Sequence, residues 1–175
     1  ARKWKKKVLT IFLFIQLLII GLLAASCTAN KYLPEGKKYY DGATIKWSHE
    51  PDVSGKDRRN TLSDLNEVIR PDPNFKWLGM RPKVWFYHIA GEVEKEKGFK
   101  HWLKYKVGGE PVYLEDVNYQ QVNRLIGNRL TLNGFFQGRS RPELIEHDHN
   151  AVIQYEVSAS NPYRYDTIAL VAGKG

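Results

Sequence analysis

Residues 139–157 read RSRPELIEHDHNAVIQYEV, and this stretch decides the fold. Two runs, 139–146 and 151–157, are separated by the turn-forming residues 147–150. In the second run, apolar residues occupy every odd position, whereas positions 154 and 156 are polar. This alternation predicts an antiparallel hairpin with one buried face.

The segment before the hairpin predicts a helix that packs on it. Asn118, with Gln121 three residues later, has the form of a capping box, and Asn133-Gly134 supplies a left-handed C-cap before Phe135-Phe136 enters the core. Residues 111–114 are expected to be a short strand or an extended entry segment, so that residues 110–160 form one compact unit. The expected buried stripe of the helix consists of Val122, Leu125, Ile126 and Leu130.

Further elements are expected upstream. Alternation over 43–47 predicts a strand, 49–60 has the composition of a loop, and apolar spacing over 61–69 predicts a helix that ends at the prolines after it. A helix is expected to begin at Pro82 and to end near Gly91, and residues 99–106 predict a second amphipathic helix. Together with the hairpin, these elements predict the α+β class.

The first 27 residues have the composition of an export signal. Five basic residues lie in the first seven positions, and without them the formal charge falls from +8 to +3. The uncharged segment 8–25 follows and leads through small residues to Cys27, the only cysteine, so an internal disulfide is excluded. The pattern resembles a bacterial lipoprotein lipobox, although Ala24 stands where a larger aliphatic residue is usual.

The lipobox resemblance implies that residues 1–26 are a signal peptide and that Cys27 receives diacylglycerol and a fatty acyl chain. The alternative is a simple signal anchor followed by an unmodified cysteine. No acidic residue follows directly after Cys27, which favours an outer-membrane lipoprotein whose polypeptide faces the periplasm. Residues 27–41, with Pro34, Gly36 and three lysines, predict a polar tether.

Several short motifs resemble one family. They are residues 30–36, 70–74, 78–82, 109–112 and 133–136. Together they resemble the POTRA (polypeptide-transport-associated) unit of the BamA/TamA family of outer-membrane assembly proteins, in its lipidated, TamL-type branch. The resemblance divides the mature chain into a POTRA-like region at 42–108, a POTRA domain at 109–160 and the start of a following strand or unit at 161–175. It also implies that the chain is an N-terminal fragment of a protein with a C-terminal barrel.

The resemblance implies a scaffold for insertion or translocation of outer-membrane proteins. Its expected partners are unfolded outer-membrane polypeptides and a TamB-like protein anchored in the inner membrane. Binding would proceed by β-augmentation at strand 139–146 or 151–157, whichever is unpaired on its outer side. Pro142 lacks a backbone donor and favours 139–146 as the outer strand, with the proline directed away from the ladder. The rival is a structural lipoprotein without a barrel that binds a glycan or another envelope component. The candidate client-binding residues are Arg139, Ser140, Arg141, Glu143, Leu144 and Ile145.

Other chemistries find little support in the sequence. No nucleophile elbow or phosphate loop is present, so no catalytic residue or cofactor is expected, and His147-Asp148-His149 lacks the further ligands of a metal site. The export signal and the charge of +3 also disfavour nucleic acid as a partner. One basic and aromatic segment is a candidate face for a membrane or a partner: Lys100, Trp102, Lys104, Tyr105 and Lys106. The alternative for this segment is a solvated or inter-domain face.

Overall fold

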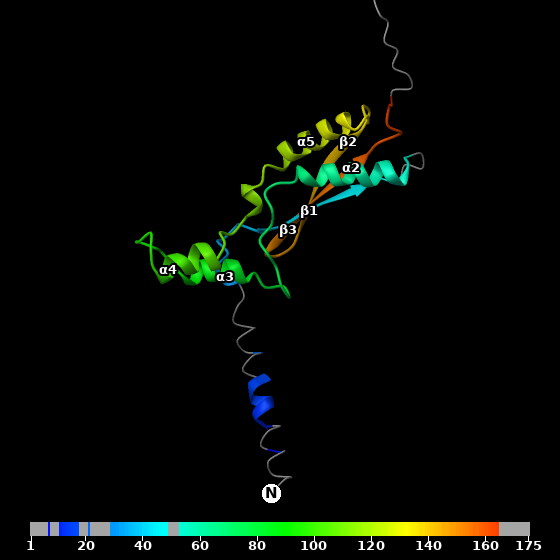
Figure 1. Ribbon diagram of the computed structural model, residues 1–175. Coiled ribbons are helices and arrows are strands. Elements are labelled where there is room, and N and C mark those ends of the chain that lie inside the picture. The colour runs from blue at the N-terminus through cyan, green and yellow to red at the C-terminus, as the bar shows by residue number, and fades with distance from the viewer. Residues whose placement is uncertain (1–6, 8–10, 18–20, 22–28, 49–52, 165–175) are drawn as a thin grey trace, which may run out of the picture. The chain divides into compact units, whose positions relative to one another are not determined.

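The computed structural model describes residues 7, 11–17, 21, 29–48 and 53–164. These residues form an α+β fold with a three-stranded sheet in the order β1-β3-β2, as the sequence predicts (Figure 1). The chain divides into two compact units. Among the described residues, unit 1 contains those up to Tyr39 and Asn74–Val112, and unit 2 contains Tyr40–Pro73 and those from Tyr113 onward.

The sheet belongs to unit 2 and joins distant parts of the chain. Strand β1 spans Tyr39–Trp47, β2 spans Arg139–Glu146 and β3 spans Asn150–Ser158. Strands β2 and β3 form the predicted antiparallel hairpin, with Leu144 opposite Ile153. The odd residues of β3 from 151 to 157 are buried, which confirms the alternation read from the sequence.

Helix α5, Tyr119–Leu132, covers one face of this sheet and contacts β2. Its first turn is capped as predicted, because the Asn118 side chain accepts a hydrogen bond from the Gln121 N–H at 3.0 Å. At its other end Gly134 has a φ of +88°, the left-handed conformation that glycine adopts without strain. Phe135 is buried as expected, but Phe136 is exposed.

The buried stripe of α5 is narrower than the sequence predicts. Val122, Ile126 and Leu130 are buried at intervals of four residues, whereas Leu125 is 40% exposed. A step of one residue rotates the side chain by about 100° around the helix axis, so Leu125 lies beside the row that faces the sheet. The assignment of Leu125 to the core is therefore wrong.

Helix α2, Gly55–Glu67, packs beside α5 and begins earlier than the expected 61–69. The Ser54 hydroxyl accepts a hydrogen bond from the Asp57 N–H at 3.1 Å and fixes the first turn. The expectation of a loop through residue 60 is wrong, because the sequence analysis missed this serine cap. Thr61 and Leu65 form the buried side of the helix.

Unit 1 is built from short helical segments. Helix α3, Pro82–Ile89, begins at its proline as predicted, and Gly91 follows it with a φ of +65°. The amphipathic segment after it is helical as predicted, but only its first part, α4 (Phe99–Trp102), is an α-helix; η2 (Leu103–Val107) is a π-helix. Gly108 allows close packing here, since a Cβ atom would lie 2.6 Å from the Lys104 carbonyl oxygen.

A polar tether is not present over residues 29–41. Ala29–Tyr32 forms a 3₁₀ turn, η1, that contacts α3, and Ala29 is buried. The Tyr39 hydroxyl donates to the Ala29 carbonyl oxygen at 2.9 Å, and the Arg81 guanidinium lies 4.4 Å from the centre of the Tyr39 ring. The burial of Ala29 and the contacts of Tyr39 make this lysine-containing segment part of the folded structure.

The contiguous division of the sequence at residues 108 and 109 differs from the units observed. Segment 74–112 of unit 1 is inserted into unit 2, and Asn74 holds its two ends together. The Asn74 amide donates to the Glu110 carbonyl oxygen and accepts from the Val112 N–H, both at 2.7 Å. Two motifs of the family resemblance, 70–74 and 109–112, therefore meet through one side chain.

Of the two alternatives for 111–114, a short strand or an extended entry segment, the structure has the second, since Tyr113 is extended and the segment is not a strand of the sheet. That segment leads through Tyr113 into a short 3₁₀ turn, η3 (Leu114–Asp116), and the sheet takes β1 instead. Helix α5 packs on the hairpin as predicted, but Tyr40–Pro73 belongs to the same unit. Residues 110–160 are consequently only part of a compact unit.

Candidate functional site

Strand β2 is one edge of the sheet, whereas β3 is paired on both sides. Of the two candidate strands, only 139–146 thus has an outer edge, and no further strand pairs with it within the described part of the chain. The candidate residues Arg139, Ser140, Arg141, Glu143, Leu144 and Ile145 all lie on this strand.

The direction of the β2 backbone follows from the hairpin hydrogen bonds. The His147 N–H donates to the Asn150 carbonyl oxygen at 2.8 Å, so its backbone groups face β3. In antiparallel pairing the direction alternates from one residue to the next. The backbone groups of residues 145, 143, 141 and 139 therefore also point toward β3, and those of residues 146, 144, 142 and 140 point away from it.

A second hydrogen bond, on the other side of β3, supports the same assignment. The Ser48 N–H donates to the Val157 carbonyl oxygen at 2.7 Å, so the Val157 backbone faces away from β2. Val157 is opposite Ser140, which must then direct its own backbone outward. The outer edge consequently offers carbonyl oxygens at Ser140, Pro142 and Leu144 and N–H groups at Ser140 and Leu144.

Pro142 suits this edge. It lies opposite Tyr155, at a position where its nitrogen points away from β3. A proline there removes no hydrogen bond from the sheet, although it leaves the outer edge with one donor fewer. Edge strands of natural proteins use such prolines to limit pairing with other strands.

The two faces of β2 differ. The Ser140 hydroxyl donates to the side-chain oxygen of Asn123 on α5 at 2.6 Å, so the even-numbered residues lie on the face that the helix covers. Arg141, Glu143 and Ile145 are exposed on the opposite face. There the Lys46 and Glu156 side chains form an exposed ion pair at 3.4 Å. The face of β2 opposite to α5 is mostly polar, so its side chains do not favour an apolar ligand.

The basic and aromatic segment of unit 1 is only partly a surface. Trp102 and Tyr105 are exposed, as are Lys100 and Lys106. Lys104, however, donates to the Gly91 carbonyl oxygen at 2.9 Å, and its ammonium group lies 4.7 Å from the centre of the Tyr87 ring. Lys104 therefore links η2 to the α3 region through contacts within unit 1, whereas the other four candidate residues are exposed.

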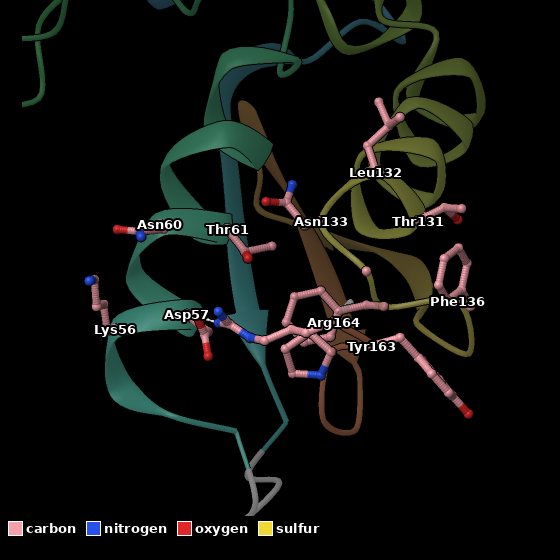
Figure 2. Close-up of a pocket in the computed structure, with 13 residues that line it drawn as sticks. Lys56, Asp57, Asn60, Thr61, Thr131, Leu132, Asn133, Phe136, Tyr163 and Arg164 are labelled. Carbon is pink, nitrogen blue, oxygen red and sulfur yellow. Dashed lines mark hydrogen bonds and ion pairs between the residues drawn. The ribbon is translucent and has the colours of Figure 1, made fainter. Parts of the chain in front are cut away.

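Sequence reasoning missed an open groove in unit 2 with a volume of about 1020 Å³. Figure 2 shows it between α2 and the C-terminal end of α5, with Tyr163 and Arg164 across its mouth. Arg164 pairs with Asp57. The hydrogen bond from Ser54 and then the Arg164 guanidinium lower the pKa of the Asp57 carboxyl. Leu132 and Phe136 line the groove and are exposed, but the sequence analysis placed Phe136 in the core, so the sequence pattern carries no signal of this groove.

The histidines do not assemble a reactive centre in the described residues. His147 and His149 are exposed in the hairpin turn, and no group of three metal-ligating side chains occurs there or elsewhere in the part that the structure describes. His88 stacks on Tyr32 with ring centres 4.9 Å apart, and burial and then Lys104 lower its pKa. A neutral stacked imidazole fits a packing role in unit 1.

Two expectations concern the N-terminus. Cys27 lies outside the described residues, as does most of the signal segment 1–26. Among the residues that the structure does describe, no helix has both the length and the apolar character needed to cross a bilayer.

Comparisons with known proteins add no relative. No protein-family model, no curated protein and no solved structure matches the chain.

Proposed function

We propose that the chain is the periplasm-facing N-terminal part of an outer-membrane lipoprotein that assists the insertion or translocation of outer-membrane proteins. In this proposal Cys27 carries the lipid, and unit 2 is a POTRA-like unit that binds extended client segments. A TamB-like partner anchored in the inner membrane is proposed on the family resemblance alone. The protein is proposed to act by binding, without catalysis, cofactor or nucleic acid.

The outer edge of β2 carries the proposal. An extended polypeptide can add to such an edge through backbone hydrogen bonds, which accept many different sequences. Client segments of outer-membrane barrels are themselves strands of alternating character, so they suit this mode of binding. The order of strand, helices and hairpin in unit 2 also supports the POTRA resemblance.

The Leu144 N–H offers a direct test, because it points outward and contributes no bond to β3. Leu144→Pro should remove an outer-edge donor while the hairpin ladder stays intact. Leu144→Ala is the matched control, since it shortens the same side chain but keeps the N–H. A photo-crosslinking residue at exposed position 143, in the full chain, reports binding of a denatured outer-membrane barrel protein.

The proposal expects crosslinking to be lost in Leu144→Pro and kept in Leu144→Ala, with circular dichroism showing that both variants are folded. In the native host, Leu144→Pro should also reduce the amount of assembled barrel proteins. Wild-type crosslinking and assembly in a folded Leu144→Pro chain would mean that clients do not use this edge.

The groove of Figure 2 favours the rival function, a lipoprotein that binds an envelope component. Its lining combines aromatic rings with amide, hydroxyl and charged groups, the mixture that suits a glycan. Binding of purified envelope glycans that is abolished by Tyr163→Ala and unaffected by Leu144→Pro would support this second function.

A further inference from the structure

A short turn at residues 75–80 exposes an unusual group of apolar side chains in unit 1. Two backbone hydrogen bonds of 2.9 Å, one in each direction between Trp77 and Met80, hold the turn together. Phe75 is 57% exposed, Trp77 58% and Leu78, at the tip, 77%. Large apolar residues gathered at the tip of an ordered turn suggest a surface that meets an apolar partner.

The backbone conformation of the turn makes a leucine at its tip unusual. Leu78 has a φ of +48°, in the left-handed region, and Gly79 follows with a φ of +78°. Turns with two such residues favour glycine, asparagine or aspartate at both positions. A leucine there adds strain, and its exposed side chain gains no packing within the fold. Strain of this kind at an exposed position points to a function for the side chain.

The position of Ala29 determines how far unit 1 can lie from Cys27. Ala29 is buried in unit 1, where its carbonyl oxygen accepts the Tyr39 hydroxyl. Cys27 precedes it by two residues, which span at most about 7 Å even when fully extended. This step rests on the proposed function, in which Cys27 is acylated. If it is, unit 1 lies directly at the bilayer surface and not at the end of a flexible tether.

The charge of unit 1 suits the same surface. Its residues 29–39 and 74–112 contain eleven Lys and Arg but five Glu, a formal charge of +6. Residues 40–73 and 113–175 of unit 2 contain eleven basic and fourteen acidic residues, a formal charge of −3. The formal charge of the mature chain is modest because the acidic unit 2 partly cancels the basic unit 1, which lies next to the proposed lipidation site. Basic surfaces are attracted to anionic headgroups.

We propose that the turn at residues 75–80 docks on an anionic bilayer, with Trp77 at the level of the headgroups and Leu78 inserted at the acyl boundary. Tryptophan favours this interface because its ring is apolar and its N–H is polar. Docking would fix the orientation of unit 1 on the membrane, which a lipid anchor alone does not do.

A fluorescent probe at the tip tests the docking. In the acylated protein Cys27 is blocked, so Leu78→Cys supplies a single free thiol for an environment-sensitive nitrobenzoxadiazole label. The matched control is Leu132→Cys in unit 2, because Leu132 is 78% exposed and also carries an apolar side chain. Both labelled full-length chains are reconstituted into vesicles of phosphatidylethanolamine and phosphatidylglycerol.

The label at position 78 should emit at shorter wavelength in vesicles and be quenched by spin-labelled acyl chains, whereas the label at position 132 should behave as in water. Adding Trp77→Lys should lower the docking equilibrium constant of the position-78 label about thirtyfold, which corresponds to the burial of such a side chain at about 2 kcal/mol. The backbone bonds that hold the turn do not involve the Trp77 side chain, and circular dichroism checks the fold.

Water-like emission at position 78 in an acylated protein would overturn the docking and leave the proposed lipid anchor intact. Equal effects at positions 78 and 132 would also overturn it, because the label itself would then be the cause. Mass spectrometry of the same sample reads acylation separately, and a mass without acyl chains on Cys27 would contradict both the anchor and the inference built on it.

Discussion

Two neighbouring side chains on α5 show how much a single residue step decides. Ile126 is fully buried, whereas Leu125 is 40% exposed. Ile126→Ala should lower the free energy of unfolding by about 2–5 kcal/mol, because it leaves a cavity above the sheet. Leu125→Ala should cost less than about 0.5 kcal/mol. Urea denaturation of both variants measures the difference, and similar losses would mean that the helix is rotated from the orientation described.

The apolar pattern of α5 could not separate these two residues in advance. Val122, Leu125, Ile126 and Leu130 all fit a helical stripe, and the width of a stripe depends on what it packs against. The same limit applies to Phe135 and Phe136, of which only the first is buried. The hydrogen bonds of the Asn74 side chain could not be predicted for a different reason, since its partners are 36 and 38 residues away in the chain.

At the scale of elements, α2 depends on a cap that lies outside the apolar pattern. The Ser54 hydroxyl accepts from the Asp57 N–H and donates to the Asp57 carboxylate at 2.8 Å. Ser54→Ala should therefore cost about 1 kcal/mol of stability. Ser63→Ala, at an exposed position inside the same helix, is the control and should be neutral or slightly stabilising. Thermal unfolding of the two variants compares them, and equal midpoints would rule out the cap.

Elements with strong local signals could be predicted from the sequence. The hairpin has strict alternation, α5 has an asparagine cap and a terminal glycine, and α3 has a proline at its start. The sequence carries no such signal for the π-helical turn of η2, in which Lys104 contacts Gly91 and Tyr87. Likewise, Pro142 favours 139–146 as an outer strand, and the order of the sheet confirms that β2 is an edge.

At the scale of the whole molecule, the inserted segment makes a clear prediction about fragments. Asn74 ties Glu110 and Val112 to itself, so the insertion begins and ends at one point. A chain in which residues 75–111 are replaced by a short glycine linker should keep a folded unit 2. A fragment of residues 109–175 lacks β1 and α2 and should remain unfolded.

Circular dichroism and cooperative thermal unfolding distinguish the linker-replaced chain from the 109–175 fragment. A folded 109–175 fragment would show that the contiguous division expected from the sequence is the correct one. The sequence could not reveal the insertion, because its signals are local and the closure of unit 2 joins residues from both ends of the chain.

The pairing of β1 with β3 also limits how early unit 2 can fold. Lys46 and Glu156, which face each other across these strands, are 110 residues apart in the chain. Contacts between such distant residues form slowly, because a long loop must close before they contribute any stability. During synthesis β1 and α2 must wait for almost the whole described chain before their sheet can be completed. In a newly made chain, unit 2 therefore stays incomplete until β3 has been synthesised, although the residues of unit 1 are available much earlier.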